Sequence, residues 1–527
     1  MVSNTNDNYR LVRGLGLLAA VSVIIGNVIG TGVFLKSRVM TCNVGSPAWV
    51  LIAWIAAGLL SLAGALTYAE LTAMKPQAGG EYVFLRDAYG RLSSFLFGWM
   101  QMFITKPGSQ AAAGVAFAIG LNDFLDGKLN QTIAQTNILG TNLEITTLQI
   151  VALMVIIIFT TLNCASVAIS GQIAAVLTFV KIGLIVFVGF GAFIWVTGDF
   201  AHFSLMNNGG TCEGVADSAR YGAPGYTFAA GFGAAMLGAL WGYDGWNNLT
   251  FVAGEVKDPN RNIPLAIIGS TVLVIVLYIF VHIGYFYVLD PTTIASVSKS
   301  SSVAKVVVSG FFGGNAASLA TGIAVAIFTV GLMMSSLGTL HTSILAGSRI
   351  PYVMAEDGLM IRKLGKLSIT GVPIAALIFQ GFIAAILVFS GSFDTLTDYV
   401  IFGSWIFYAL VTSSIFVFRK RFPDAERPYR AWGYPVIPVL FLLVAGWLLI
   451  NTFYSALPQV SSGLSETWSG IKIIDSRTIW SGIWRIISSS PIAGSLLIIL
   501  GLPVYYYLNN KRKNVNDGEG KGPDDNN

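Results

Sequence analysis

The chain has 527 residues, of which 54% are apolar and only 11% are Asp, Glu, Lys or Arg. A soluble domain carries about 25% of these charged residues, so the composition excludes a nucleic-acid-binding protein, a disulfide-stapled secreted domain and a soluble enzyme with a single core. With a net charge of only +5 and 58 glycines, the chain is typical of a multi-pass membrane protein, because glycine is more frequent in membrane helices than in soluble ones.

Twelve windows of the chain are long and apolar enough to cross a bilayer, which takes about 20 residues. We therefore predict an all-helical (all-α) integral membrane protein with twelve transmembrane helices in the lipid bilayer. No window resembles a removable signal peptide, because the polar start runs into a full-length span with no cleavage site behind it. The windows are 14–36, 46–74, 91–121, 148–167, 171–197, 226–251, 264–289, 316–349, 371–390, 395–418, 434–454 and 491–509.

Basic residues in the loops set the predicted orientation, because Lys and Arg concentrate on the cytoplasmic side. With the N-terminus inside, 20 of them fall on the cytoplasmic face and 9 outside, so both termini are predicted to be cytoplasmic. The outside then holds long polar loops at 199–225, 291–315 and 455–490. Cys42 and Cys212 also fall outside, where they can form a disulfide in an oxidising compartment; two unrelated thiols are the alternative.

Two spans contain glycine-rich interruptions. The first contains Gly26, Gly30 and Gly32 within IIGNVIGTG, and the sixth contains Gly242 and Gly245 within LWGYDGWN. Glycine costs roughly 1 kcal/mol relative to alanine in a helix interior and permits non-helical backbone. A membrane tolerates such backbone where it lines a protected or watery cavity. Ordinary close packing of helices through small residues is the alternative.

The two interruptions occupy matching places if the chain is built from two sets of five spans. In such an inverted repeat of spans 1–5 and 6–10, with two spans appended, a matched pair of broken helices points to a transporter site near the bilayer midplane. N–H groups at a half-helix start favour a carboxylate, and carbonyls at an opposing end favour an ammonium. Together these ends describe a receptor for a zwitterion, which is an amino acid.

The predicted organisation follows from these spans. A cytoplasmic N-terminal segment precedes the first repeat, an external loop separates the two repeats, and a disordered cytoplasmic tail follows the last helix. In chain order the segments are 1–13, 14–197 (first repeat), 198–225 (external loop), 226–418 (second repeat), 419–510 (last two helices, with the loop 455–490) and 511–527 (tail).

Charged residues deep within predicted spans need partners. An ionised lysine at a helix centre costs about 2.5–3.5 kcal/mol on insertion scales, so Lys181 is expected to face the bundle interior; snorkelling to an interface is the alternative. Asp244 is the only carboxylate expected deep in a span, because Glu70 lies towards a cytoplasmic end. Its partner is either Lys181 or a cationic group of the substrate. Lys106 precedes Pro107 and is assigned only to a kink.

Six runs occur in a characteristic order: IIGNVIGTGVF, AGLLSLAGALTYAEL, GGEYVFLRDAYG, KPGSQ, WGYDGWNNL and DPNRNIPLAI. In combination they resemble the L-type amino acid transporter branch of the amino acid–polyamine–organocation (APC) superfamily, from residue 14 to about residue 450. Through Trp241 and Asp244 the likeness is nearest to the subtype that exchanges cystine, dibasic and neutral amino acids. It implies a five-plus-five inverted-repeat fold with helices 1 and 6 broken, followed by two C-terminal helices. It also implies alternating access, exchange of one amino acid for another, and a stand-alone, prokaryotic-like protein.

The resemblance also implies which residues bind substrate. The N–H groups that would take the carboxylate lie around Gly30, Thr31 and Gly32. The carbonyls that would take the α-ammonium lie near Val28, Trp241, Gly242 and Asp244. The full expected set is Asn27, Val28, Gly30, Thr31, Gly32, Trp241, Gly242, Asp244 and His341. His341 departs from the family, which usually has an asparagine there, and a hydrogen-bonded interior histidine is the alternative.

Three of these positions carry further implications. Lys181 matches a family lysine that stands where sodium-driven relatives bind an ion, and its ammonium would substitute for sodium by bonding carbonyls near Gly26 and Gly30. Trp241 resembles an aromatic gate that closes over the substrate from outside, with ordinary core packing as the alternative. Asp244 would receive a substrate guanidinium or ammonium, whereas neutral-selective relatives tend to have glycine there.

We therefore predict a sodium-independent exchanger (antiporter) of L-amino acids, of broad neutral and cationic range, in the plasma membrane or the inner membrane of a bacterium. A proton-coupled amino acid or polyamine symporter is the alternative, since His341 and Asp244 can titrate. An enzyme is not expected, because three scattered histidines supply no catalytic constellation. A channel filter is equally absent from the pattern. No cofactor, metal or nucleic acid is expected.

The resemblance also bears on protein partners. Eukaryotic members of the branch join a single-span partner through a cysteine in the external loop between helices three and four. Residues 122–147 contain no cysteine, so no disulfide-linked heavy subunit is expected. We expect a monomer or a weak homo-oligomer.

Overall fold

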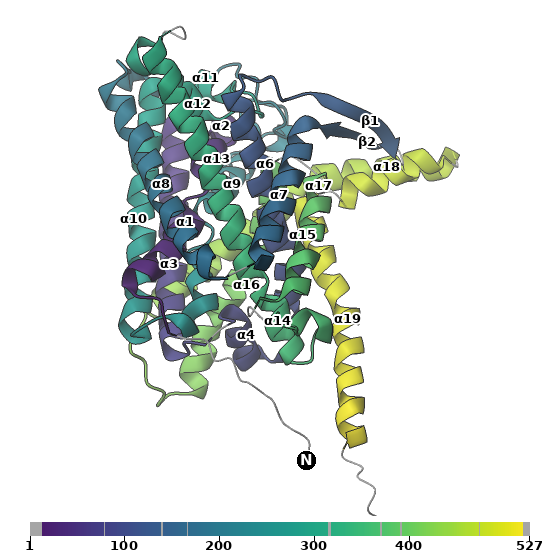
Figure 1. Ribbon diagram of the computed structural model, residues 1–527. Coiled ribbons are helices and arrows are strands. Elements are labelled where there is room, and N and C mark those ends of the chain that lie inside the picture. Colours follow the sequence, from purple (N-terminus) through teal and green to yellow (C-terminus); the bar gives the residue numbers. More distant parts are fainter. Residues whose placement is uncertain are drawn as a thin grey trace, which may run out of the picture.

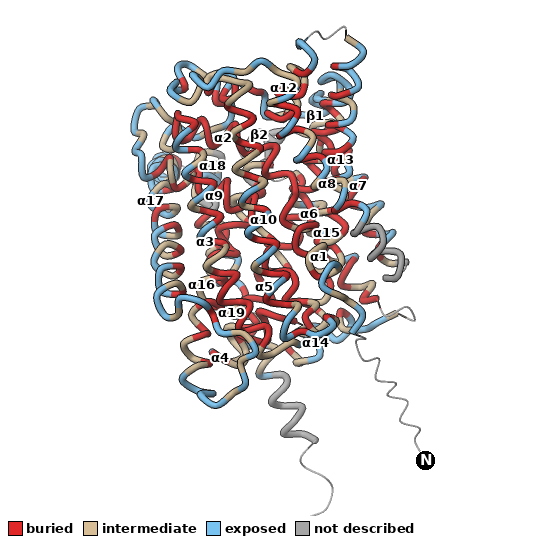
Figure 2. The backbone as a smooth tube through the Cα atoms, turned by 90° about the vertical axis from the view of Figure 1, so that its left-hand side faces the viewer, coloured by how far each residue is buried: buried red, intermediate tan, exposed pale blue. Residues whose placement is uncertain are grey.

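The computed structural model describes residues 13–77, 79–138, 141–165, 167–314, 318–368, 372–389, 393–473, 475–487 and 489–519. Its long helices run roughly side by side in a bundle, and a two-stranded sheet lies at one end (Figure 1). Buried residues line the inside of the bundle, while exposed residues concentrate on its flanks and ends (Figure 2). The flanks expose many large apolar side chains, as expected for a surface that contacts lipid.

Nine helices of the described chain are long and apolar enough to span a membrane. They cover nine of the twelve predicted windows, because long runs of Leu, Ile, Val, Ala and Phe form helices that satisfy their own backbone groups in lipid. As elements they are α1 (Leu17–Val28) with α2 (Gly32–Val44), α3 (Pro47–Met74), α7 (Thr147–Ala165), α8 (Val167–Ile194), α10 (Pro259–Val288), α13 (Leu319–Gly347) with α14 (Arg349–Glu356), α16 (Phe393–Arg421), α17 (Val436–Ile473) and α19 (Ser490–Glu519).

The other three windows are helical where they are described, but shorter or interrupted. The predicted kink near Pro107 is present as a π-helical turn directly before it. These windows consist of α5 (Arg91–Met100), the π-turn η1 (Gln101–Thr105) and α6 (Lys106–Phe124); of α9 (Phe228–Tyr243) and the 3-10 helix η4 (Asn248–Glu255); and of α15 (Ile374–Val388). Twelve membrane crossings thus remain a prediction.

Short elements gather at the two ends of the bundle (Figure 1). The segments predicted to lie outside are at one end, and those predicted to lie inside are at the other. The first group is α11 (Pro291–Ala295), α12 (Val303–Ser309), α18 (Ser476–Ile487) and the antiparallel strands β1 (Thr132–Ile138) and β2 (Thr141–Thr146); the second is α4 (Glu81–Tyr89) and α14. The remaining short helices are η2 (Phe200–Ser204), η3 (Asp217–Ala219), η5 (Phe311–Gly313) and η6 (Arg362–Gly365).

The loop predicted at 455–490 is wrong. Helix α17 continues to Ile473, and α18 folds back against it. The physical reason is a helical spacing of apolar residues among polar ones. A segment with this spacing contains no uniformly apolar window, although it forms a helix. These residues are Leu457, Val460, Leu464, Trp468 and Ile471.

The predicted disordered tail needs a similar correction. Helix α19 continues to Glu519, so residues 511–519 extend the last span instead of ending it. Residues 520–527 of the predicted tail lie outside the described residues, as do residues 1–12 of the predicted N-terminal segment.

A disulfide joins Cys42, near the end of α2, to Cys212 in the loop 199–225. Both cysteines are buried beside Ala295 of α11. The bond therefore ties this loop to the second half of the interrupted first helix. Cys164, in α7, is a free thiol.

Candidate binding site

The first predicted interruption is a true break in the helix. Helix α1 ends at Val28, α2 begins at Gly32, and three residues between them are not helical. Thr31 stands at the N-cap of α2 without a side-chain cap hydrogen bond, so its hydroxyl does not occupy the first N–H groups of that helix. Such a start offers N–H groups and a partial positive charge to an anion.

The second predicted interruption is also a break. Helix α9 ends at Tyr243, the backbone is extended at Asp244 (φ −61°, ψ 137°), and the chain resumes as η4 at Asn248. Gly245 has φ +110°, a conformation that glycine adopts without steric cost. This glycine therefore lets the chain turn between the two helical pieces.

The two breaks lie against each other. A Cβ atom on Gly32 would come 2.8 Å from the Cα of Gly242, and one on Gly245 would come 2.9 Å from the Cβ of Asn27. Side chains at these positions would push the segments apart. The glycines thus allow the backbone of one break to approach the backbone of the other.

A pocket opens beside this contact. Of the nine residues expected to bind substrate, seven line it, whereas Gly242 and His341 do not. Five further residues contribute polar groups from η4, α6 and α13. The complete lining is Asn27, Val28, Gly30, Thr31, Gly32, Lys106, Ser109, Trp241, Asp244, Asn248, Thr339 and Ser343.

Tyr278 of α10 occupies two carbonyls that were expected to take an ammonium. Its hydroxyl lies 2.7 Å from the carbonyl oxygen of Val28 and 2.9 Å from that of Gly242. Because a hydroxyl has one proton and each carbonyl oxygen has two lone pairs, acceptor capacity remains at both. Gly242 is nevertheless packed against Trp54 and Tyr278. It therefore contributes to the contact between the two breaks and does not line the pocket.

Lys106 brings a second charge into the pocket. Its side chain is 7% exposed, its Nζ donates to Oδ1 of Asn248 at 3.1 Å, and it lies 5.2 Å from the ring centre of Phe251. Lys106, which was expected only at a kink, therefore also lines the pocket. A lone lysine within a span was the available signal, the same one that identified Lys181.

Asp244 lies in the pocket and accepts a hydrogen bond from the Tyr408 hydroxyl at 2.7 Å. Among the described residues no salt bridge joins it to Lys181. The alternative of a fixed ion pair between these two residues therefore does not hold in this structure. One carboxylate oxygen is held by Tyr408, and the group faces the pocket.

Lys181 joins three helices behind the first break. It is fully buried in α8, and its Nζ donates to the carbonyl of Gly26 in α1 at 2.6 Å and to Oγ1 of Thr339 in α13 at 2.9 Å. The expected bond to a carbonyl near Gly26 is present, while the second partner is Thr339 and not the expected carbonyl of Gly30. The ammonium thus lies between helices α1 and α13.

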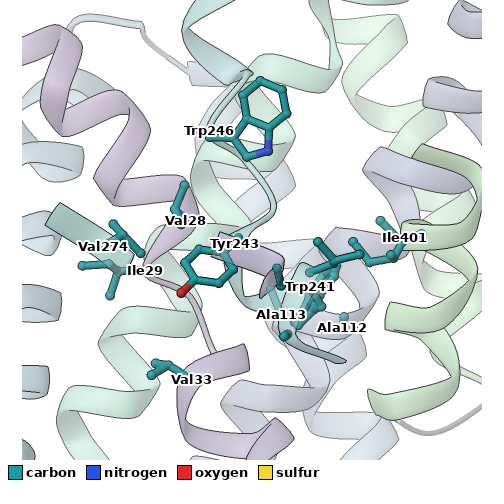
Figure 3. Close-up of a cluster of buried hydrophobic side chains, with 14 of the residues drawn as sticks. Val28, Ile29, Val33, Ala112, Ala113, Trp241, Tyr243, Trp246, Val274 and Ile401 are labelled. Atoms are coloured by element: carbon teal, nitrogen blue, oxygen red, sulfur yellow. The ribbon is translucent and has the colours of Figure 1, made fainter. Parts of the chain in front are cut away.

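Trp241 and Tyr243 lie on different sides of the second break (Figure 3). Trp241 is 8% exposed, contacts the start of α2 at Gly32, and faces the Phe393 ring edge-on with 6.1 Å between ring centres. Tyr243 lies on the side of Val28 in Figure 3. Trp241 therefore lies between the start of α2 and Phe393, the first residue of α16.

Ion pairs join α2 to α16 near Trp241. Lys36 of α2 lies 2.9 Å from Asp394 and 3.6 Å from Asp398 of α16, and Arg38 lies 3.2 Å from Asp394. Lys36 and Arg38 are almost completely buried. These pairs hold the second half of the broken first helix against α16.

A second, mostly apolar cavity lies on the opposite side of the pocket. It shares Asn27 and Asn248 with the pocket and extends between α1, α8 and α13 to Glu255 and Arg349 at the α4–α14 end. His341 lines this cavity instead of the pocket, with its Nδ1 3.1 Å from Nδ2 of Asn163. The site thus adjoins a mostly apolar cavity towards this end, while Trp241 and the α2–α16 ion pairs lie towards the other.

A buried carboxylate that was not predicted from the sequence lies in α4, next to the second break. Glu81, the first residue of α4, is fully buried, and its Oε1 accepts hydrogen bonds from Tyr68 at 2.7 Å and from Asn247 at 3.1 Å. Asp244 is therefore not the only acidic group inside the bundle. Within the described part of the chain, no group of three or more His, Cys, Asp or Glu side chains is placed to hold a metal ion.

Comparisons with known proteins show the family of the chain. A family model described as amino acid permease matches residues 15–474. The b(0,+)-type amino acid transporter 1 of Mus musculus is 30% identical over 446 residues, which are 84% of this chain and 83% of that protein. The serine/threonine exchanger SteT of Bacillus subtilis (strain 168) is 29% identical over 467 residues, 88% and 95% of the two chains. The Homo sapiens cystine/glutamate transporter is 28% identical over 498 residues, 94% and 91%.

Proposed function

We propose, from the premise that this chain belongs to the amino acid permease family, that it is an antiporter of amino acids in a cell membrane. The observation that carries the proposal is the pocket between the two broken helices, which presents the start of one half-helix and the end of another to one small space. The named relatives are amino acid transporters and an exchanger. Their names support the substrate class and the exchange of one amino acid for another.

The zwitterionic part of the substrate would bind between the breaks. N–H groups around Gly30, Thr31 and Gly32 would receive the carboxylate, because the start of α2 has no side-chain cap. Carbonyl oxygens of Val28 and Trp241 would receive the α-ammonium. Both poles of the substrate would then be held by backbone atoms, which leaves its side chain to be chosen by other residues.

Asp244 is the group in the pocket that would accept a cationic side chain. Its second carboxylate oxygen is not held by Tyr408, and a buried carboxylate favours a cationic partner. Lys106 lies in the same pocket and would offset this charge when the substrate side chain is neutral. These two residues together support a range that includes neutral and cationic amino acids.

Lys181 would make transport independent of sodium. A fixed ammonium bonded to Gly26 and Thr339 occupies the space between α1 and α13, where a bound cation would otherwise be needed to join the helices. Replacement of sodium by choline should therefore leave exchange unchanged. A strict sodium requirement would refute this assignment.

Alternating access would come from movement of the broken helices in a five-plus-five inverted repeat. Trp241 and the ion pairs between α2 and α16 would form the outer closure, and the cavity between α1, α8 and α13 would be the inner path. We place both termini and the α4–α14 end in the cytoplasm, following the excess of Lys and Arg in those loops.

A proton-coupled symporter is the second candidate, and two carboxylates inside the bundle favour it: Glu81, which is buried, and Asp244, which is partly buried. The two functions are separated by measuring the uptake of labelled amino acid into sodium-free liposomes that contain the purified protein. An exchanger takes up label only when the liposomes contain unlabelled amino acid, with or without a pH gradient. A symporter accumulates label in empty liposomes when the outside is acidic.

A further inference from the structure

We infer that Glu81 is a proton-binding site whose occupancy depends on the charge of the substrate side chain at Asp244. It holds a proton when the pocket is empty or contains a neutral amino acid, and it loses that proton when a cationic side chain binds. This inference rests on the proposed function, because it requires that cationic and neutral amino acids use the same pocket.

The first argument is the environment of Glu81. Its side chain is completely buried, its Oε1 accepts both of the hydrogen bonds it receives, from Tyr68 and Asn247, and its Oε2 has no hydrogen-bond partner. A buried carboxylate oxygen without a donor is costly while it carries charge. A proton on Oε2 removes that cost, because it neutralises the group.

The second argument is a direct connection to the substrate pocket. Asn247, which donates to Glu81, has its Oδ1 3.5 Å from the Tyr408 hydroxyl, and this hydroxyl donates to Asp244 at 2.7 Å. One amide and one hydroxyl therefore separate the two carboxylates. A change of charge at Asp244 acts on Glu81 across this short, buried path, where water screens little.

The third argument is the charge balance of the cluster. Lys106 supplies one positive charge, and Asp244 and Glu81 supply two negative charges, so one more positive charge is needed for neutrality. A cationic substrate supplies it, and a proton on Glu81 supplies it otherwise. An uncompensated buried charge costs several kcal/mol, which is why the two positive charges alternate.

Among the described residues, the other charged groups near Glu81 already have partners, including Glu255 of η4, which pairs with Arg349. Tyr68 of α3 and Tyr408 of α16 are neutral donors, and the next charged side chains on α3, α4, α5 and α16 have partners of their own. Lys75 pairs with Asp87, Arg86 with Asp357, and Arg419 and Arg427 with Glu70, while Arg91 donates to the Asp357 carbonyl.

The titration of Glu81 agrees with this balance. Burial, helped by the negative charge of Asp244, raises the pKa of Glu81 to about 7, although the hydrogen bonds from Tyr68 and Asn247 and the charge of Lys106 lower it. A cation that neutralises Asp244 lowers the pKa further. Near neutral pH, binding of a cationic amino acid therefore expels a proton.

The test is to count protons released when amino acids bind to the purified full-length protein. The protein is kept in a weakly buffered solution with a pH indicator at pH 7, and saturating arginine or leucine is added. Arginine should release a substantial fraction of one proton per protein and leucine almost none. Leucine is the matched ligand, because it has the same α-amino and carboxyl groups.

Two variants locate the proton. Glu81→Gln should bind leucine but release no proton with arginine, whereas Glu144→Gln, which changes an exposed carboxylate on β2, should behave as the wild type. An undiminished release in Glu81→Gln overturns the assignment. So does an absence of release by the wild type at every pH from 6 to 8.

The wild type alone also decides the question if Glu81→Gln does not fold. Its affinity for arginine should rise at least about threefold between pH 6 and pH 8, while its affinity for leucine should not change. Release of one proton on binding can change the affinity by at most about tenfold per pH unit. Equal pH dependence for both overturns the proposal. If leucine binds and arginine does not, the cationic role of Asp244 and this proposal fail together; if neither binds, the transport function itself fails.

Discussion

The two ends of the binding site differ in the contacts that surround them. At the α11–α12 end, Lys36 and Arg38 are buried and lie 2.9 and 3.2 Å from Asp394. At the α4–α14 end, Arg349 lies 3.7 Å from Glu255 beside a mostly apolar cavity. Beside the pocket, the first end is therefore held by short ion pairs whose basic members are buried, whereas the cavity at the second end is bordered by one longer ion pair.

This difference shows how the molecule separates binding from closure. Separation of α2 from α16 would leave the buried groups of Lys36 and Arg38 without their carboxylate partners, which is costly unless water or other groups replace them. An apolar cavity closes by the approach of α1, α8 and α13 without such a cost. The pocket between them is made largely of backbone at the two breaks, and changes to either end need not alter it.

The largest effect is expected at Lys181, which lines the mostly apolar cavity between α1, α8 and α13. Lys181→Ala leaves the Gly26 carbonyl and Thr339 hydroxyl without their ammonium donor, and each buried polar group left unsatisfied costs about 1–3 kcal/mol, so exchange should fall roughly 100-fold. Counterflow of labelled leucine into loaded, sodium-free liposomes measures it. Lys299→Ala, which removes an exposed lysine, is the control, and near-normal exchange by Lys181→Ala would contradict the account.

The second largest effect is expected at Asp244, in the pocket between the two ends. Asp244→Gly should lower arginine and lysine uptake more than about tenfold, because a charged hydrogen bond is worth about 1.5–3 kcal/mol, and it should leave leucine uptake nearly unchanged. Tyr408→Phe is the matched control, since it removes the hydrogen bond to Asp244 and keeps the carboxylate. Equal loss of arginine and leucine uptake in Asp244→Gly would show a structural role instead.

Trp241 sharpens the comparison from the α2–α16 side of the pocket. Trp241→Ala removes the ring between the pocket and Phe393, so exchange should slow about tenfold while leucine affinity changes less than threefold, as expected for a gate. Exchange rates and binding measured on the same preparation give both numbers. A loss of affinity as large as the loss of rate would make Trp241 part of the binding surface and not a gate.

The smallest effect is expected at the ion pairs of the α11–α12 end. Asp394→Asn weakens the contacts to Lys36 and Arg38 and should raise the population open at that end several-fold, about 1 kcal/mol. The rate at which an impermeant external thiol reagent labels Ser109→Cys in a Cys164→Ser background reports it. Asp217→Asn, which breaks a surface pair with Arg220, should leave the labelling rate unchanged. No difference between the two variants would rule out a closing role for Asp394.

The breaks and Lys181 could be predicted because each violates a strong local rule of the membrane. Glycines at close spacing weaken a helix interior, and a lone lysine in a span demands a partner. Lys106 obeys the same rule, but its neighbour Pro107 offered a simpler explanation for an irregular helix. The helix beyond residue 455 was missed because its apolar residues are diluted by polar ones.

Glu81 could not be found from the sequence because its burial is a tertiary effect. It lies outside every apolar window, and it is brought beneath the second break by Gly79 (φ +96°) and Gly80 (φ +43°). A Cβ atom on Gly80 would come 2.4 Å from Oγ1 of Thr250, so only glycine lets α4 start against η4. The sequence shows two adjacent glycines before an acidic residue, but it does not show which segment these glycines pack against.

The central claim is that two broken helices hold both poles of an amino acid, and competition by one-pole analogues tests it most directly. Labelled leucine counterflow in sodium-free liposomes is measured with unlabelled leucine, with 4-methylpentanoate, which lacks the ammonium, and with isoamylamine, which lacks the carboxylate. Leucine should inhibit strongly, and each analogue at the same concentration should leave uptake within about twofold of the control, because losing either pole removes a charge-assisted hydrogen-bond set. Inhibition by either analogue as strong as that by leucine would contradict the account.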